Sequence, residues 1–252
     1  MPLASLAAPA SGVRVIALHA SPNAKGDLEN RFTPDLIREV NALLDAVLAD
    51  EAPIALVITG KGKFFSNGHD IAWLEEASSA QQQEFIRDFY RLIARLMTFP
   101  VLTVACINGH AFAGGCLLAM ALDYRVMRGD AGFICMNEID MGLVPAAKPS
   151  KILPGVFKNA DWKMTAILKA KLGALVVRDM MLKGSRLAAK DALGLRVVDA
   201  IAANEAEAMR DAVSLAAALS AKAPAHNRRT VGILKYELVR DTLPVLLDGA
   251  SL

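Results

Sequence analysis

Two glycine-bearing stretches of the chain have residue types that could bind a negatively charged oxygen. Residues 60–71 read GKGKFFSNGHDI, and residues 108–116 read NGHAFAGGC. Glycine lets a backbone N–H approach a ligand without an intervening Cβ, and N–H groups at a helix start favour negative charge. The N–H groups of His69 and Gly114 could therefore converge as an oxyanion hole. Close packing of a helix on a strand is an equal alternative explanation of Gly114 and Gly115.

A third candidate is the carboxylate of Glu138. It follows the apolar run FICM and precedes Gly142, Leu143, Val144 and Pro145. Partial burial would raise its pKa and make it a better general base. Taken alone, however, an acid at this place fits an exposed turn better.

The elements that would position these groups are short, apolar strands. IALVIT (54–59) precedes the first stretch and VLTVACI (101–107) precedes the second, and runs without polar residues are typical of strands covered on both faces. Ligand sites of such sheets collect at the carboxyl ends of the strands. The two stretches are therefore expected as loops at one edge of a parallel sheet.

The remaining pattern predicts an α/β core followed by a helical tail. Thr33-Pro34-Asp35 reads as a helix start, because it combines a cap, an early proline and an acid. Further strands are predicted at 13–19, 124–128 and 132–136, and helices at 78–97, 113–122, 160–172, 175–183, 187–193, 205–222 and 226–240.

Composition excludes several other classes of protein. The 28 basic and 26 acidic residues among 252 leave a net charge of +2, which gives no nucleic-acid footprint. The longest apolar run, near 111–122, is too short to span a bilayer. Cys106, Cys116 and Cys135 lack CxxC spacing, so buried free thiols are expected rather than disulfides or a metal site.

Together, four segments resemble the crotonase superfamily of enoyl-CoA hydratases and isomerases over roughly residues 12–245. The segments are GKGKFFSNGHDIAWL, INGHAFAGGCLLAMALDYRV, FICMNEIDMGLVP and SRLAAKDALGLRVVDAI, in the order of the chain. The resemblance implies a spiral of ββα units, expected at 1–190, with a C-terminal helical trimerisation region at 191–252. It also implies a homotrimer or a dimer of trimers, and no cofactor apart from the coenzyme A of the substrate.

The implied ligand is an acyl-CoA thioester whose carbonyl lies between the N–H groups of His69 and Gly114. The implied substrate pocket and CoA contacts are Lys61, Lys63, Ser66, Asn67, Gly68, Asp70, Ile71, Gly115 and Leu117. Asp70 is expected to bind backbone N–H groups of its own loop, and Asp123 to cap or pair within the core. Arg228, Arg229 and Lys235 could meet the CoA of a neighbouring subunit.

The chemistry depends on which acids are retained. Hydratases of the superfamily carry one glutamate directly after the Gly-Gly-Cys and a second in the third segment. Here Leu117 occupies the first position and Glu138 the second. A single base can shift a proton from the α-carbon to the γ-carbon, and FFSNGHDIAWL is similar to delta-3, delta-2-enoyl-CoA isomerases of the plant peroxisomal type.

Other functions stay open at this point. The chain could be a hydratase or a dienoyl-CoA isomerase with its second acid elsewhere, for example Glu75 or Glu76, or a non-catalytic acyl-CoA-binding protein. After Pro145 it reads Ala-Ala-Lys-Pro, unlike many hydratases. Ala250-Ser251-Leu252 loosely resembles a peroxisomal address, although the basic middle residue is missing. Because of this signal and the family resemblance, we expect a peroxisomal location, and otherwise a cytoplasmic one.

Overall fold

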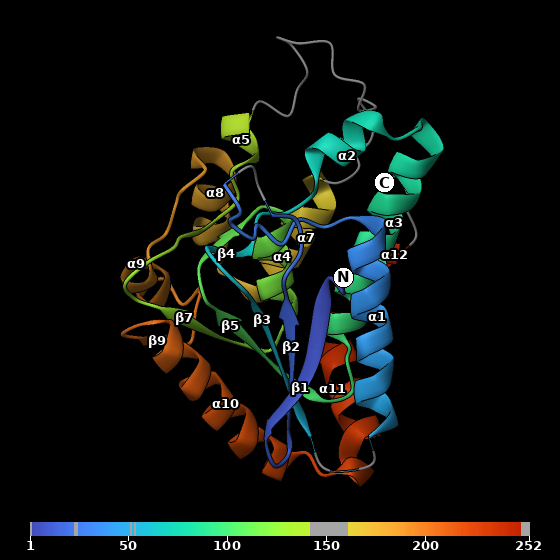
Figure 1. Ribbon diagram of the computed structural model, residues 1–252, viewed down its shortest axis with the longest axis vertical. Coiled ribbons are helices and arrows are strands. Elements are labelled where there is room, and N and C mark those ends of the chain that lie inside the picture. Colours follow the sequence, from blue (N-terminus) through green and yellow to red (C-terminus); the bar gives the residue numbers. More distant parts are fainter. Residues whose placement is uncertain (1, 23–24, 51, 53, 142–160, 248–252) are drawn as a thin grey trace.

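The molecule is built around a six-stranded, mostly parallel sheet (Figure 1). A computed structural model describes residues 2–22, 25–50, 52, 54–141 and 161–247. The strand order is β1-β2-β3-β5-β7-β9, and only β1 runs antiparallel to its neighbour. The strands are Ala4–Ala10, Val13–Leu18, Ala55–Gly60, Leu102–Ile107, Tyr124–Arg128 and Ala200–Ala202.

Alternation along the strands assigns each face of this sheet to different helices. Val57 and Val104 face α10 (Glu205–Lys222), whereas Ile58 and Ala105 belong to the larger core on the other face. That core also holds α1 (Pro34–Ala49), α3 (Ser79–Met97) and α4 (Gly114–Ala121). Figure 1 shows α10 on one side of the sheet and α1 and α3 on the other. Because both faces are covered, the strands carry no polar stripe.

The second sheet is small, and each of its strands follows a strand of the first sheet along the chain. It contains β4 (Phe64–Ser66), β6 (His110–Phe112) and β8 (Ile134–Cys135), all parallel, in that order. The chain thus passes three times from a large-sheet strand to a small-sheet strand and then to a helix: β3-β4-α2, β5-β6-α4 and β7-β8-α5. This is the spiral of ββα units that the resemblance implies.

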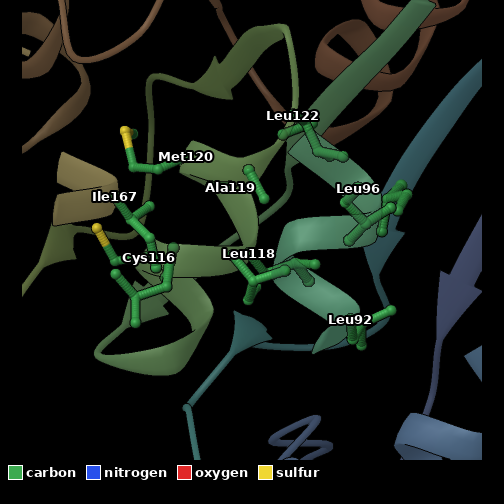
Figure 2. Close-up of a cluster of buried hydrophobic side chains, with 14 of the residues drawn as sticks. Leu92, Leu96, Cys116, Leu118, Ala119, Met120, Leu122 and Ile167 are labelled. Carbon is green, nitrogen blue, oxygen red and sulfur yellow. The ribbon is translucent and has the colours of Figure 1, made fainter. Parts of the chain in front are cut away.

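Helix α4 is buried on every side, which explains why nothing charged follows its glycines. All eight of its residues are buried. Figure 2 shows Leu118 on the side of Leu92 and Leu96 of α3, and Cys116 toward Ile167 of α7 (Asp161–Lys171). A helix that is apolar all round is a core helix.

The helical tail packs on the core through apolar side chains and through one buried ion pair. Besides α7 and α10 it contains α8 (Ala174–Lys183), α9 (Ala189–Gly194), α11 (Arg228–Val239) and α12 (Leu243–Leu247). The Nζ of Lys235 lies 2.5 Å from Asp123 Oδ2 and donates to Val101 O at 2.7 Å. Asp123 therefore pairs in the core as expected. The expected CoA contact of Lys235 is wrong, because this side chain is 5% exposed.

Most predicted elements are confirmed, with ends shifted by at most two residues. The N-cap of α1 is Thr33, whose side chain accepts from the N–H of Leu36 at 3.3 Å. The expectation of plain loops at 60–71 and 108–116 is wrong, because they contain β4, β6 and the start of α2 (Ile71–Glu76). Strands of three residues are too short to show a period, and β1 and β9 were missed too.

Two expectations, about the cysteines and about membrane spans, can be checked in the described part of the chain. Its three cysteines are free and buried, as expected. No helix among the described residues is long and apolar enough to cross a membrane. Residues 142–149 and the C-terminal tripeptide lie outside the described residues, and the boundary at residue 190 stays a prediction.

Candidate active site

Three segments meet at the carboxyl edge of the small sheet. Asn67–His69 follow β4, Ala113 and Gly114 follow β6, and Met136–Glu138 follow β8. Because β4, β6 and β8 are adjacent and parallel, their carboxyl ends lie at the same edge. The three groups singled out from the sequence are thus brought to one place by three short strands, of which only β8 was expected from the sequence.

Hydrogen bonds of the Ser66 side chain hold the first segment in place. Its Oγ donates to Asn30 O at 2.7 Å and accepts from the N–H of Gly68 at 3.3 Å. Gly68 has a φ of +76°. A Cβ at Gly68 would lie 3.0 Å from the backbone nitrogen of Gly114, so this close approach of the two segments needs glycine. Ser66 is a buried structural hydroxyl here.

The backbone of His69 is oriented by a bridge to Phe32. The N–H of Phe32 donates to Gly68 O at 2.7 Å, and the N–H of Asp70 donates to Phe32 O at 3.0 Å. In a parallel bridge these bonds use the groups on either side of His69, so its own N–H points away from Phe32. Asp70 then caps α2 through Oδ1, which accepts from the N–H of Trp73 at 3.1 Å.

The second segment turns sharply into α4 at Ala113, whose φ is +50°. Gly114 is the first residue of α4, so its N–H has no acceptor within the helix. A Cβ on Gly115 would lie 2.1 Å from Ser66 O, and one on Gly114 would lie 3.3 Å from Phe89 Cζ. The close-packing explanation of the glycines is thus observed, and it does not exclude a second role for the N–H of Gly114.

Glu138 begins α5 (Glu138–Met141), three residues beyond the end of β8. Its Oε2 is shielded from solvent. The carboxylate lies near the second segment, since its charge contributes to the raised pKa of Cys116 in α4, after burial and Cys135. Burial raises the pKa of Cys135 to about 12, with a smaller contribution from Glu138. Both thiols are thus inert, and Glu138 is the acid that the described residues place at this edge beside α4.

The imidazole of His69 is enclosed by aromatic rings of α3. It makes edge-to-face contacts with Phe85 and Phe89, at centroid distances of 5.1 and 4.5 Å. Burial lowers the pKa of His69 to about 4, so the ring is neutral at pH 7. This low pKa argues against a catalytic imidazolium at this position near neutral pH.

The other expected pocket residues fall into three groups. Asn67 is tied to Glu29, to which its N–H and its Nδ2 both donate. Ile71 is partly buried against the core at the start of α2. Lys61 and Lys63 are exposed, and within the described part of the chain neither amine pairs with a carboxylate. The two lysines are thus available to an anionic ligand.

Leu117 lies within α4 and is fully buried. Its N–H donates to Ala113 O at 3.0 Å, which makes it the first residue bonded into the helix. Glu75 and Glu76, considered as alternative second acids, are exposed at the end of α2. Neither position therefore supplies a buried second carboxylate.

Two buried asparagines that support the site escaped the sequence reasoning. Asn30, with a φ of +50°, accepts from the N–H of Ala20 and donates to Phe64 O at 2.8 Å. Asn108 accepts from the N–H of Gly60 and donates to Gly62 O, both at 3.0 Å. The Asn108-Gly109 pair is a turn signal in the sequence, whereas nothing local distinguishes Asn30.

Comparison with known proteins identifies the family of the chain. The family described as "Enoyl-CoA hydratase/isomerase" matches residues 10–248. The chain belongs to the enoyl-CoA hydratase/isomerase family. It is 36% identical to "Enoyl-CoA delta isomerase 3" of Arabidopsis thaliana, over 78% of this chain and 79% of that protein. It is 35% identical to "Enoyl-CoA delta isomerase 2, peroxisomal" of the same plant, over 72% of each.

Solved structures of the family share the fold. The human mitochondrial delta3-delta2-enoyl-CoA isomerase superposes with a TM-score of 0.79 at 22% identity, covering 98% of this chain and 86% of that one. At this identity the likeness supports the crotonase fold alone. The family assignment and the ββα spiral are therefore established independently of the residues proposed for chemistry.

Proposed function

We propose that the protein is a delta-3, delta-2-enoyl-CoA isomerase, which converts 3-enoyl-CoA to 2-enoyl-CoA in fatty-acid β-oxidation. The proposal rests on two residues taken together. Glu138 is present at the site, and the buried Leu117 occupies the position where hydratases of the family carry a glutamate. The relatives named as enoyl-CoA delta isomerases support it. The family includes hydratases as well, so the number of acidic residues at the site is what favours isomerisation over hydration.

In the proposed mechanism, the N–H groups of His69 and Gly114 bind the thioester oxygen. Glu138 takes a proton from C2, and the electron pair of that C–H bond delocalises through C1 onto the oxygen and through the 3,4 double bond to C4. Glu138 then returns the proton to C4, which leaves the double bond between C2 and C3. No atom is gained or lost, and the carboxylate is regenerated.

The backbone amides lower the cost of the first step because they stabilise the dienolate oxyanion. One such donor contributes on the order of 3–4 kcal/mol in enzymes where it has been measured. Apolar neighbours favour isomerisation over hydration, because Leu117 and Leu118 are buried and offer no group that could activate water. Lys61 and Lys63, exposed beside β4, are proposed to meet the phosphates of the CoA moiety.

The test is the ratio of two activities of the purified protein. With 3-hexenoyl-CoA we expect rapid formation of 2-hexenoyl-CoA, and with crotonyl-CoA we expect hydration slower by at least about 100-fold. Hydration as fast as isomerisation would favour the hydratase alternative. Tight binding of both esters without turnover would favour the non-catalytic acyl-CoA-binding alternative.

We propose that the chain forms a homotrimer or a dimer of trimers through its helical tail. The exposed side of α11 is unusually apolar, with Leu234 60% and Leu238 80% exposed. Such a patch is typical of a protein–protein interface. Light scattering after gel filtration should show three or six copies, and Leu238→Glu should shift the population toward the monomer.

A peroxisomal location is proposed from relatives alone. Enoyl-CoA delta isomerases 2 and 1 of Arabidopsis thaliana, at 35% and 33% identity, are named as peroxisomal. A fluorescent protein fused to the N-terminus should colocalise with a peroxisomal marker in plant cells. A diffuse cytoplasmic signal would contradict this location and leave the proposed reaction untouched.

A further inference from the structure

Residues 29–32 belong to neither sheet and run alongside the segment that carries the N–H of His69. Four hydrogen bonds join them to residues 66–70. The bonds run from Asn67 N–H to Glu29 O at 2.9 Å, from Ser66 Oγ to Asn30 O at 2.7 Å, from Phe32 N–H to Gly68 O at 2.7 Å, and from Asp70 N–H to Phe32 O at 3.0 Å. Residues 29–32 thus support the first half of the proposed oxyanion hole.

One of these bonds sets the direction of the His69 N–H. This N–H belongs to the same peptide group as Gly68 O, and in a trans peptide the two point in opposite directions. Because Gly68 O accepts from Phe32, the N–H of His69 points away from Phe32. Gly68, at a φ of +76°, has no side chain to restrain this peptide group, so its orientation depends on where Phe32 lies.

The side chain of Asn30 fixes residues 29–32 in turn. Its Oδ1 accepts from the N–H of Ala20 at 2.9 Å, and its Nδ2 donates to Lys61 O at 3.2 Å and to Phe64 O at 2.8 Å. Both amide hydrogens are thus used, and the residue is fully buried. Its φ of +50° lies in the left-handed region, which asparagine tolerates better than most residues. One carboxamide therefore ties residues 29–32 to the chain after β2, to the turn after β3 and to β4.

We propose that Asn30 is a positioning residue of the reaction, whose carboxamide holds residues 29–32 against β4 and thereby aims the N–H of His69 at the thioester oxygen. This inference rests on the proposed function, because it takes that N–H as a donor to the substrate. It goes beyond that function in giving a catalytic consequence to a side chain that bonds only to the protein backbone. Without the carboxamide, the site still binds the ester but polarises its carbonyl less.

The test measures this polarisation directly and without turnover. Hexanoyl-CoA labelled with ¹³C at C1 is bound to the protein, and isotope-edited infrared difference spectroscopy shows how far its carbonyl band moves to lower wavenumber. In Asn30→Gly, which also tolerates the left-handed backbone, the band shift should fall to less than about half of the wild-type shift. The kcat for 3-hexenoyl-CoA should fall about 100-fold, while KM changes less than about threefold.

Gln82→Ala is the matched control. Gln82 is a second buried carboxamide, 1% exposed, whose Nε2 donates to Leu74 O at 2.9 Å and to Ala77 O at 3.1 Å. Like Asn30→Gly, this variant removes an amide from two backbone carbonyls, so it should also lower the free energy of unfolding. Since those carbonyls lie outside residues 66–70, its band shift and its kcat should stay within about twofold of the wild type.

Equal band shifts in the wild type and Asn30→Gly, or equal losses of the shift in both variants, would overturn the inference. If Asn30→Gly fails to fold, as judged by circular dichroism, Asn30→Asp replaces it with the same expected loss of shift, because a carboxylate cannot donate to the two carbonyls. A wild type that shifts the band but does not isomerise 3-hexenoyl-CoA would remove the proposed function alone. A full shift in Asn30→Gly, together with normal isomerisation by the wild type, would remove the inference alone.

Discussion

The two sheets of this protein divide its work. The six-stranded sheet is built from runs such as β3 and β5, whose buried residues pack on helices from both sides. The three-stranded sheet has strands of two or three residues, and its carboxyl edge holds His69, Gly114 and Glu138. The large sheet contributes to both apolar cores, and the small one positions the groups proposed for the chemistry.

This difference shows how a site can be precise although its own strands are marginal. Strands this short are not stable by themselves. The small sheet depends on hydrogen bonds from outside it, such as those of Asn30 to Phe64 O and of Ser66 to Asn30 O. Substitutions at the two sheets should therefore separate chemistry from stability.

The largest expected effect is on chemistry at the small sheet. Glu138→Gln should lower kcat for 3-hexenoyl-CoA about 1000-fold, because the amide cannot take a proton. The Kd for hexanoyl-CoA and the free energy of unfolding should change little. Asp140→Asn, two residues along on the exposed side of α5, is the matched control and should retain at least about half of the activity. Comparable losses in both variants would contradict the role of Glu138.

Gly115→Ala should damage both stability and activity. The added Cβ would lie 2.1 Å from Ser66 O, and neither backbone segment can move away without breaking β4 or α4. We expect a loss of about 3 kcal/mol in the free energy of unfolding, measured with urea. Gly194→Ala is the control, since a Cβ there meets nothing within 4 Å. Equal stability of the two variants would show that the small sheet is more adaptable than described.

The enclosure of His69 predicts a pH dependence of stability. Its folded-state pKa, about 4, lies below the unfolded value of 6.5, so its stabilising contribution is present above pH 6.5 and is lost as the pH falls toward 4. Between pH 7.5 and 4.5 the wild type should lose about 2 kcal/mol more than His69→Phe. Urea unfolding of both proteins at the two pH values measures the difference. Parallel losses would show that the ring is accessible to solvent.

The smallest effect on activity is expected in the large sheet. Val57→Ala removes two buried methyl groups between β3 and α10, which should cost about 1.5 kcal/mol of unfolding free energy. Since Val57 lies on the face away from α4, kcat/KM for 3-hexenoyl-CoA should stay within about twofold of wild type. A larger kinetic loss would mean that the two sheets are more tightly coupled than their contacts indicate.

The sequence predicted the large sheet better than the small one, for physical reasons. IALVIT and VLTVACI are long enough to read as buried strands, and Thr33-Pro34 marks the start of α1 by its own chemistry. By contrast, FFS and HAF become strands because neighbouring segments pair with them, which is a tertiary effect. Likewise the burial of Lys235 depends on Asp123, over 100 residues away along the chain, and no local pattern reveals it.

The candidate site could be located from the sequence only through the combination of its parts. Gly114, Gly115 and Glu138 each had an ordinary structural explanation, and for the glycines the structure shows that explanation to be real. The sequence pattern did not reveal the residues that support them, above all Asn30, which has a positive φ. Its partners lie up to 36 residues away, so their convergence is a property of the fold.

The central claim is that one carboxylate moves a proton from C2 to C4, and isotope transfer tests it most directly. Single-turnover conversion of 3-hexenoyl-CoA deuterated at C2, in ordinary water, should give 2-hexenoyl-CoA with a measurable part of the label at C4. Glu138→Gln should give neither product nor transfer on the same time scale. Rapid isomerisation with only solvent hydrogen at C4, or undiminished turnover by Glu138→Gln, would contradict the single-base account.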